Sequence, residues 1–146
     1  MTAVAFHFGA PDKLAYVCRL LRKATIAGAK VLVLAPDSIV TRLDSDLWAL
    51  SPTEFIPHCV GTAQPVVKKR SAVVLASDIV QAPSLRQVLL NLGQTVPTQF
   101  ALFERVIEVV STDETDRNHA RMRWRDYTER GYPITRHDLN LRGTLA

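Results

Sequence analysis

Arginines recur at helical spacing around one tryptophan in a segment near the C-terminus. Five side chains lie at the spacing i, i+4, i+7, i+8 and i+11 of one helical face: Arg117, Arg121, Trp124, Arg125 and Thr128. Planar guanidinium groups pair with carboxylates through two parallel hydrogen bonds, and an aromatic ring receives an apolar anchor. The pattern therefore predicts a site for a carboxylate-rich peptide.

The same stripe allows two other interpretations. It could follow a nucleic-acid backbone, with Trp124 stacking on a base, or it could be a solvated helix face whose tryptophan packs on a sheet. Arg123 and Arg130 add positive charge, whereas Asp126 and Glu129 interrupt it and argue against a strong phosphate-binding track. The net charge of the whole chain is only +4, so composition alone does not decide between these alternatives.

A second candidate surface surrounds Trp48, near the end of another predicted helix. Pro52, Phe55 and Pro57 follow it around the next predicted strand. Large apolar residues at such a junction belong either to the core or to a patch that binds a partner protein. The residues alone leave both interpretations open.

The motifs of nucleotide-binding and catalytic sites are missing from the sequence. No Gly-x-Gly-x-x-Gly follows the first predicted strand, and Gly28 lacks the upstream glycine of a P-loop. His58 and Cys59 are adjacent, so in a strand they point to opposite faces and do not share a metal ion. No nucleophile stands in a pattern with a base. We therefore expect no catalytic, cofactor-binding or metal-binding residues.

Length and composition predict one folded domain over residues 1–146. Hydrophobic residues make up 47% of the chain and charged residues 22%, which is ordinary for a soluble globular protein. No run of about 18 apolar residues is present, and the first residues lack the basic flank of a signal peptide. The two cysteines are too few for a disulfide framework. These features predict a cytoplasmic protein without a membrane segment.

Apolar β-branched runs alternate with helical patterns, which is typical of an α/β fold with crossover connections. Strands are predicted at residues 4–8, 30–35, 55–58, 72–76 and up to residue 110, and helices at residues 11–26, 37–47, 84–92 and 112–130. Residues 61–70 are predicted to be the least structured part, and residues 132–139 to add an edge strand. Fully apolar strands favour a mostly parallel sheet between helical layers. The predicted fold is a single-domain Rossmann-like three-layer sandwich without the nucleotide-binding glycines.

The last predicted helix has the clearest end signals. The sequence Ser-Thr-Asp-Glu at residues 111–114 fits a capping box. In this motif a hydroxyl accepts a hydrogen bond from the N3 amide, and the side chain of Glu114 reaches back to the amide of the N-cap residue. Gly131 supplies a left-handed cap at the other end, and Pro133 prevents continuation.

Four stretches together resemble the chi subunit family of bacterial DNA polymerase III. They are Leu43-Asp44 with Leu47-Trp48, the sequence Phe-Ile-Pro-His at residues 55–58, residues 103–110, and residues 121–127 with Gly131-Tyr132. Their order and spacing agree with the family along nearly the whole chain.

The resemblance implies an accessory subunit of the replicative polymerase, with no catalysis of its own and a Rossmann-like fold that binds no nucleotide. Family members pair one-to-one with the psi subunit, which docks them on the clamp loader. They also bind the acidic C-terminal tail of single-stranded DNA-binding protein, which ends in an aromatic residue with a free carboxylate. Some are thought to pair with a repair helicase through the psi-binding surface.

The resemblance also assigns site residues. The residues that match the family's tail-binding site are Arg117, Arg121, Trp124, Arg125 and Gly131. Arg121 and Arg125 would receive carboxylates, Trp124 would form a wall for the terminal Phe, and Gly131 would let the peptide backbone approach. The family often carries Tyr and Lys where this chain has Trp124 and Arg125, and the replacements keep an aromatic wall and a positive charge.

Trp48, Pro52 and Phe55 match the family's psi-facing surface, which implies that they are exposed in the isolated subunit. Contact with DNA would be mainly indirect. Residues 65–70 match no familiar feature, and we assign them no role. The main alternative is a direct binder of single-stranded nucleic acid that uses the basic C-terminal helix.

Overall fold

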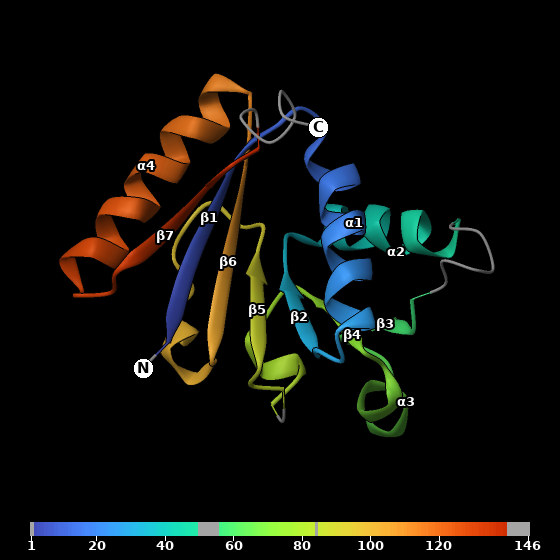
Figure 1. The fold of residues 1–146 in the computed structure, drawn as a ribbon. Coiled ribbons are helices and arrows are strands. Elements are labelled where there is room, and N and C mark those ends of the chain that lie inside the picture. The colour runs from blue at the N-terminus through green and yellow to red at the C-terminus, as the bar shows by residue number, and fades with distance from the viewer. Residues whose placement is uncertain (1, 50–55, 84, 140–146) are drawn as a thin grey trace.

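The computed structural model describes residues 2–49, 56–83 and 85–139, and these form one seven-stranded sheet (Figure 1). The strands are β1 (Ala3–Ala10), β2 (Val31–Leu34), β3 (His58–Val60), β4 (Val73–Ala76), β5 (Val88–Asn91), β6 (Arg105–Ser111) and β7 (Ile134–Asp138). They lie in the order β3-β4-β2-β5-β6-β1-β7, and each pairing among these described strands is parallel. The predicted α/β class and the largely parallel sheet are confirmed.

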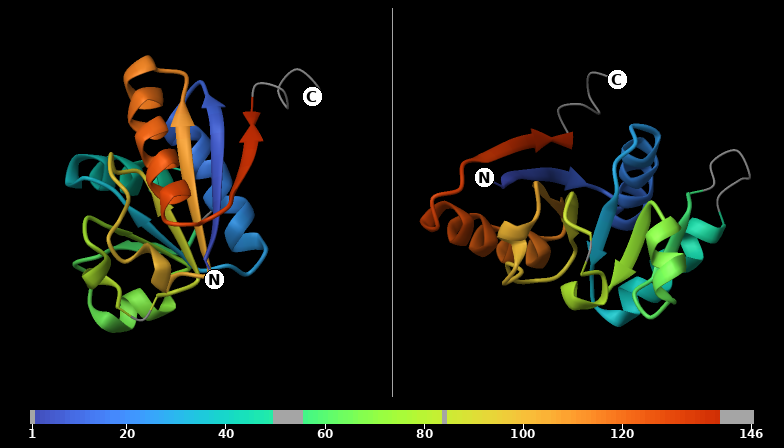
Figure 2. Two further views of the ribbon diagram at one scale, coloured as in Figure 1. Left: turned by 90° about the vertical axis from the view of Figure 1, so that its left-hand side faces the viewer. Right: turned by 90° about the horizontal axis from the view of Figure 1, so that it is seen from below.

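Helices cover both faces of this sheet (Figure 2). Helices α1 (Lys13–Ile26) and α2 (Asp37–Trp48) pack on one face, and α4 (Glu114–Glu129) packs on the other. The connections also contain α3 (Pro65–Arg70) and two short 3-10 helices, Ile79–Gln81 and Phe100–Leu102. The layers give the predicted Rossmann-like sandwich. Among the described residues, no helix is long and apolar enough to cross a membrane.

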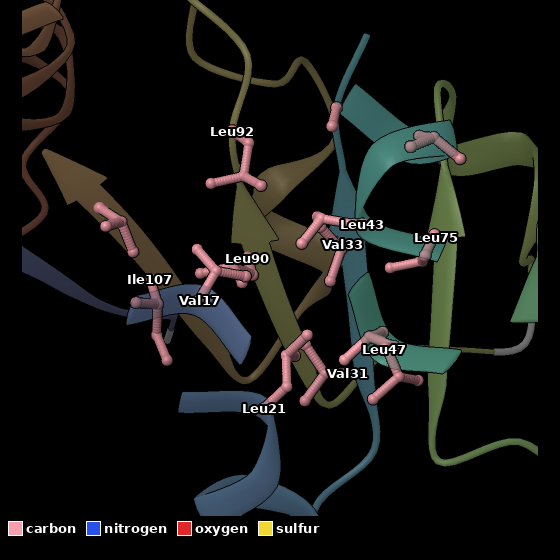
Figure 3. Packing of buried hydrophobic residues seen from close by; sticks show 14 of the residues in the cluster. Val17, Leu21, Val31, Val33, Leu43, Leu47, Leu75, Leu90, Leu92 and Ile107 are labelled. Atoms are coloured by element: carbon pink, nitrogen blue, oxygen red, sulfur yellow. The ribbon is translucent and has the colours of Figure 1, made fainter. Parts of the chain in front are cut away.

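Successive residues of the central strands point into two separate cores. On β2, Val31 and Val33 belong to the core under α1 and α2, whereas Leu32 belongs to the core on the α4 side. Figure 3 shows the first core, where Leu21 of α1 and Leu47 of α2 come together with Val31. Burying one such side chain contributes about 1.5–3 kcal/mol. The sequences of β2 and β4 are apolar at every position, as is typical of strands buried on both faces.

Residues 84–92 were expected to be helical, and this prediction is wrong. Residues 88–91 form strand β5 in the middle of the sheet, between β2 and β6. The run Val88, Leu89 and Leu90 is buried on both faces. A short apolar run fits a helix or a strand equally well by periodicity, so the packing of the neighbouring strands decides.

Two further predictions differ from the structure. Residues 61–70 were expected to be the least structured part, but residues 65–70 form α3, with Pro65 in its first turn. The strand expected at residues 55–58 is instead β3 at His58–Val60, and Phe55 lies outside the described residues. Pro57 immediately precedes β3, and β3 lies at an end of the sheet, where a proline is tolerated.

The N-terminus of α4 differs from the predicted capping box. Asp113 is the N-cap, and its Oδ2 accepts a hydrogen bond from the Asp116 amide at 3.0 Å. The Ser111 hydroxyl instead accepts from the amide of Asp113, two residues further on, at 3.2 Å. The side chain that reaches back before the helix is that of Asp116, not that of Glu114. Its carboxylate accepts a hydrogen bond from the Ser111 amide at 2.8 Å. The aspartates compete with the hydroxyl for the helix amides, which moves the cap by two residues.

The C-terminus of α4 agrees with the sequence. The helix ends at Glu129, and Gly131 follows in the left-handed conformation at φ +86°. The chain then reverses into β7, which pairs with β1. This reversal places β7 beside α4, as Figure 1 shows in orange and red.

Candidate functional site

A groove of about 570 Å³ lies between α4 and the part of the sheet formed by β1 and β7. Its lining residues come from all three elements: Arg117, Arg121, Trp124, Arg125, Thr128 and Glu129 from α4, Phe8 from β1 and Arg136 from β7. The α4 residues share one face because they recur every three or four positions. The structure thus brings together four of the five residues that the resemblance assigned to tail binding.

Trp124 forms the apolar wall of the groove. Its ring lies 5.1 Å from the ring of Phe6 and 5.8 Å from that of Phe8, measured between centroids. These contacts leave Trp124 only half-buried. The ring therefore packs on the sheet with one part and lines the groove with another. Packing on the sheet does not prevent Trp124 from contacting a ligand in the groove.

Phe8 and Arg136 complete the opposite side of the groove. The guanidinium carbon of Arg136 lies 4.6 Å from the centroid of the Phe8 ring, a cation–π contact. Neither residue is predicted from the sequence as part of a site, because no local pattern marks them. Their position depends on β7 pairing with β1, in a register that sets Arg136 beside Phe6 and Asp138 beside Phe8.

The groove is strongly cationic. Arg117, Arg121, Arg125 and Arg136 are exposed, and within the described part of the chain none of them forms an ion pair. Arg121 donates to Asn118 Oδ1 at 2.6 Å, a contact that keeps its full charge. Glu129 contributes the one carboxylate among the described lining residues. The arrangement fits an anionic group that carries an aromatic or apolar side chain.

Gly131 does not line this groove. It lies beyond the C-terminus of α4, and the space that a Cβ would occupy there is open. Its positive φ gives it a clear local role, since an L-residue in that conformation is strained. The assignment of Gly131 to peptide binding stays a prediction.

Arg123 was counted among the positive charges of the helix surface, and this is wrong. The residue is 2% exposed, and its Nε donates to Glu108 Oε1 on β6 at 2.9 Å. Tyr127, one turn further on, donates from its hydroxyl to Glu108 Oε2 at 2.7 Å, and Asn91 Nδ2 donates to the same oxygen at 2.9 Å. Arg123 also donates to the carbonyl of Gln94 at 3.3 Å.

Burial raises the pKa of Glu108, and the three donors around its carboxyl group counteract that shift. Burial, together with the neighbouring Glu108 charge, raises the pKa of Tyr127 well above its ordinary value, so its hydroxyl remains a donor. The network fixes the rotation of α4 about its axis, because Arg123 and Tyr127 face the sheet. Arg121 and Arg125 are thereby held on the groove side.

A signal for this network is present in the sequence. Glu108 interrupts the apolar strand between Ile107 and Val109, at a position buried by the sheet. A carboxylate in such a place requires a buried partner. The spacing i, i+4 of Arg123 and Tyr127 supplies that partner from one side of a helix.

The second candidate surface is exposed where the structure describes it. Trp48 is 61% exposed at the end of α2, and its ring centroid lies 4.9 Å from that of His58. His58 is buried, and its Nε2 lies 3.2 Å from Asp44 Oδ1 one turn before Trp48. Trp48 is therefore not a core residue. Pro52 and Phe55 lie outside the described residues.

His58 and Cys59 point to opposite faces of the sheet, as predicted. Cys59 belongs to the core on the α4 side, whereas His58 contacts α2 on the other side. Among the described residues, no group of three or more His, Cys, Asp or Glu side chains could hold a metal ion.

Fold and groove together define an α/β protein with a cationic, aromatic-walled groove on its last helix. The model of the family described as "DNA polymerase III chi subunit, HolC" matches residues 1–135. The chain is 32% identical to the DNA polymerase III subunit chi of Pseudomonas aeruginosa over 129 residues, which cover 87% of each chain. It is 27% identical to the Haemophilus influenzae subunit over 81% of each chain, and 26% identical to the Escherichia coli subunit over 81% of this chain and 80% of the relative. The chain belongs to the DNA polymerase III chi subunit family, and so to the proteins of DNA replication.

Proposed function

We propose that this chain, folded as one domain, is a non-catalytic accessory subunit that links the psi subunit to the acidic tail of single-stranded DNA-binding protein. The observation that carries the proposal is the groove on α4. It combines four arginines without ion pairs among the described residues and an aromatic wall. An acidic peptide with a terminal aromatic residue has the complementary chemistry.

In this proposal the terminal Phe of the tail enters the groove and packs against the exposed parts of the Trp124 and Phe8 rings. Aromatic rings prefer edge-to-face or offset contacts with about 4.5–7 Å between centroids. Trp124 and Phe8 each expose part of a ring to the groove, where such a contact can form. Arg121 and Arg125 receive carboxylates from the α4 side. Arg136, which the sequence analysis did not assign, receives one from the β7 side.

The affinity of this interaction is expected to be weak to moderate. A short peptide buries well under about 1,200 Å² of surface, and the arginines are exposed, so their charges are screened. Binding therefore weakens as salt rises.

Fluorescence anisotropy of a labelled tail peptide, titrated with the whole protein, tests the proposal. Reversing the charge of Arg121 or Arg125 to Glu is expected to weaken binding about tenfold or more, because each loses an attraction and gains a repulsion. Lys23→Glu, on the exposed surface of α1, is the matched control and is expected to leave binding unchanged. Equal loss from the groove variants and the control would contradict the assignment.

The psi subunit is proposed to bind at the surface around Trp48, with Pro52 and Phe55 contributing. An exposed tryptophan at a helix end is the kind of residue that dominates protein interfaces. Trp48→Ser is expected to abolish co-elution with the psi subunit, and with any repair helicase that shares this surface, while tail binding persists. Retained co-elution of this variant would refute the assignment.

A further inference from the structure

A row of basic side chains lies along the amino-terminal edge of the sheet. Lys30 precedes β2, Lys69 and Arg70 precede β4, Arg86 precedes β5, and Arg105 begins β6. The register shows that these strands begin at one level, because Val31 is paired with both Val73 and Val88, and Val88 is paired with Arg105. Neighbouring strands lie about 4.8 Å apart, so the row across four strands is about 14 Å long.

The charges of this row are not neutralised within the described protein. None of the five forms an ion pair with another described residue. Lys30 Nζ donates to the carbonyl of Lys69 at 3.3 Å, and Arg86 donates to the carbonyl of Leu85 at 2.8 Å. Both contacts leave the positive charge in place. Glu104, immediately before Arg105, places one carboxylate on the same edge.

The two edges of the sheet differ in charge. Aspartates follow the carboxyl ends of the strands: Asp12 after β1, Asp37 after β2, Asp78 after β4 and Asp113 after β6. Three of them accept from backbone amides that begin helices, which is the ordinary role of aspartate there. Basic residues at the end of α3 likewise suit its dipole. Arg86 and Arg105, however, lie on no helix, so helix ends do not explain the row.

A hollow of about 220 Å³ opens beside the row, between α3 and the segment that leads into β5. Three lysines line it, Lys30, Lys68 and Lys69, and no carboxylate is among its described lining residues. Lys68 Nζ is fixed by the carbonyls of Gln81 at 2.6 Å and Gly61 at 3.2 Å. The rest of the hollow is mostly apolar, with Pro65, Val74, Ala82, Pro83 and Leu85 beside Ser71.

We propose that this amino edge binds single-stranded DNA, with phosphates along the basic row and a base in the hollow. A linear row of charges suits an extended polyanion, and an apolar hollow beside it suits the flat face of a base. An acidic peptide with a terminal aromatic residue can pack that residue on Trp124 in the α4 groove, whereas the described residues that line this hollow include no aromatic ring. The surface is separate from that groove, and the proposal does not depend on tail binding.

Anisotropy of a labelled oligo(dT) of about 20 nucleotides, longer than most single-module site sizes, tests this with the full chain. We expect binding to weaken as salt rises. In a plot of the logarithm of the binding constant against the logarithm of the salt concentration, the magnitude of the slope falls by about 0.7 for each phosphate contact removed. Lys30→Gln with Lys69→Gln is therefore expected to reduce the slope by about 1.4. These side chains are exposed, so the melting temperature is expected to stay unchanged.

Arg125→Gln is the matched control, and it is expected to keep oligo(dT) binding while it weakens tail-peptide binding. A loss of oligo(dT) binding in Arg125→Gln alone would overturn the proposal and move DNA binding to α4. No binding by the unaltered protein at about 50 mM salt would also overturn it. Equal binding of oligo-glutamate at the amino edge, lost in the double variant, would assign the edge to an acidic protein instead. Tail-peptide titrations are scored separately, so either proposal can fail alone.

Discussion

Arg123→Met and Arg125→Met form a matched pair of changes on α4, two residues apart but with opposite expected effects. Arg123 is buried against Glu108, whereas Arg125 is exposed in the groove. We expect Arg123→Met to destabilise the fold and Arg125→Met to leave stability unchanged. The same substitution thus separates the residue that positions the helix from a residue that binds the ligand.

The magnitude follows from the network. Removing one partner of a buried ion pair costs about 3–5 kcal/mol, because the other charge is left uncompensated. Asn91 and Tyr127 still donate to Glu108 after the change, which favours the lower half of that range. For a domain of this size, the melting temperature falls by about 10–15 °C. An exposed substitution such as Arg125→Met changes stability by less than about 0.5 kcal/mol.

Urea unfolding followed by circular dichroism measures both variants, and pH provides a second readout. Loss of Arg123 removes an influence that lowers the pKa of Glu108, so burial raises that pKa further. A carboxyl group whose pKa is raised in the folded state favours folding at low pH and loses that contribution as pH rises through the folded pKa. The stability deficit of Arg123→Met is therefore expected to shrink as pH falls.

A double variant completes this test. Glu108→Leu combined with Arg123→Met removes both charges and leaves the Tyr127 hydroxyl without its acceptor, which costs about 1–3 kcal/mol. We expect it to be more stable than Arg123→Met alone. Equal stability of Arg123→Met and Arg125→Met would refute the role given to the network.

Three further changes test the ends and the inner face of α4. Burial tends to raise the pKa of Asp116, but the hydrogen bond from the Ser111 amide and the charge of Lys13 outweigh it, so the net pKa is lowered. A carboxyl group with a lowered pKa stabilises the fold above its unfolded pKa near 3.9, and this contribution is lost as pH falls through the folded pKa. Asp116→Asn is therefore expected to cost about 1 kcal/mol at neutral pH and less in acid, measured by urea unfolding, and an equal deficit at both pH values would contradict this. Gly131→Ala is expected to cost about 1–2 kcal/mol because of the positive φ, and Gly131→Asn less, which thermal melts measure. Tyr127→Phe removes a hydrogen bond to a buried carboxylate and is expected to cost about 1.5–3 kcal/mol in the same melts; an unchanged melting temperature would count against the bond.

Much of the fold follows from local sequence patterns. Strands such as β2 and β4 are predicted because an uninterrupted apolar run is typical of a strand buried on both faces. The end of α4 is predicted because Gly131 suits the left-handed conformation and Pro133 cannot continue a helix. Helical spacing also brings Arg117, Arg121 and Trp124 to one face, and the groove on α4 confirms that face.

Features that depend on distant segments are not predicted. β5 is four residues long, and only its place between β2 and β6 makes it a strand. Phe8 and Arg136 lie in contact on the sheet side of the groove because β7 pairs with β1, more than one hundred residues away in sequence. From the sequence, Arg123 adds to the positive charge of the helix, yet its burial depends on Glu108 in strand β6.

The two tryptophans allow the central claim to be tested by one measurement. Trp124 lies in the proposed tail-binding groove, and Trp48 lies at the end of α2 on the proposed psi-binding surface. The indole N–H signals of both are visible in a ¹⁵N–¹H correlation spectrum during titration with the acidic tail peptide. The account predicts that the Trp124 signal shifts to saturation, that the Trp48 signal stays in place, and that a peptide without its terminal Phe has little effect. A shift of the Trp48 signal alone, or no shift of either, would contradict it.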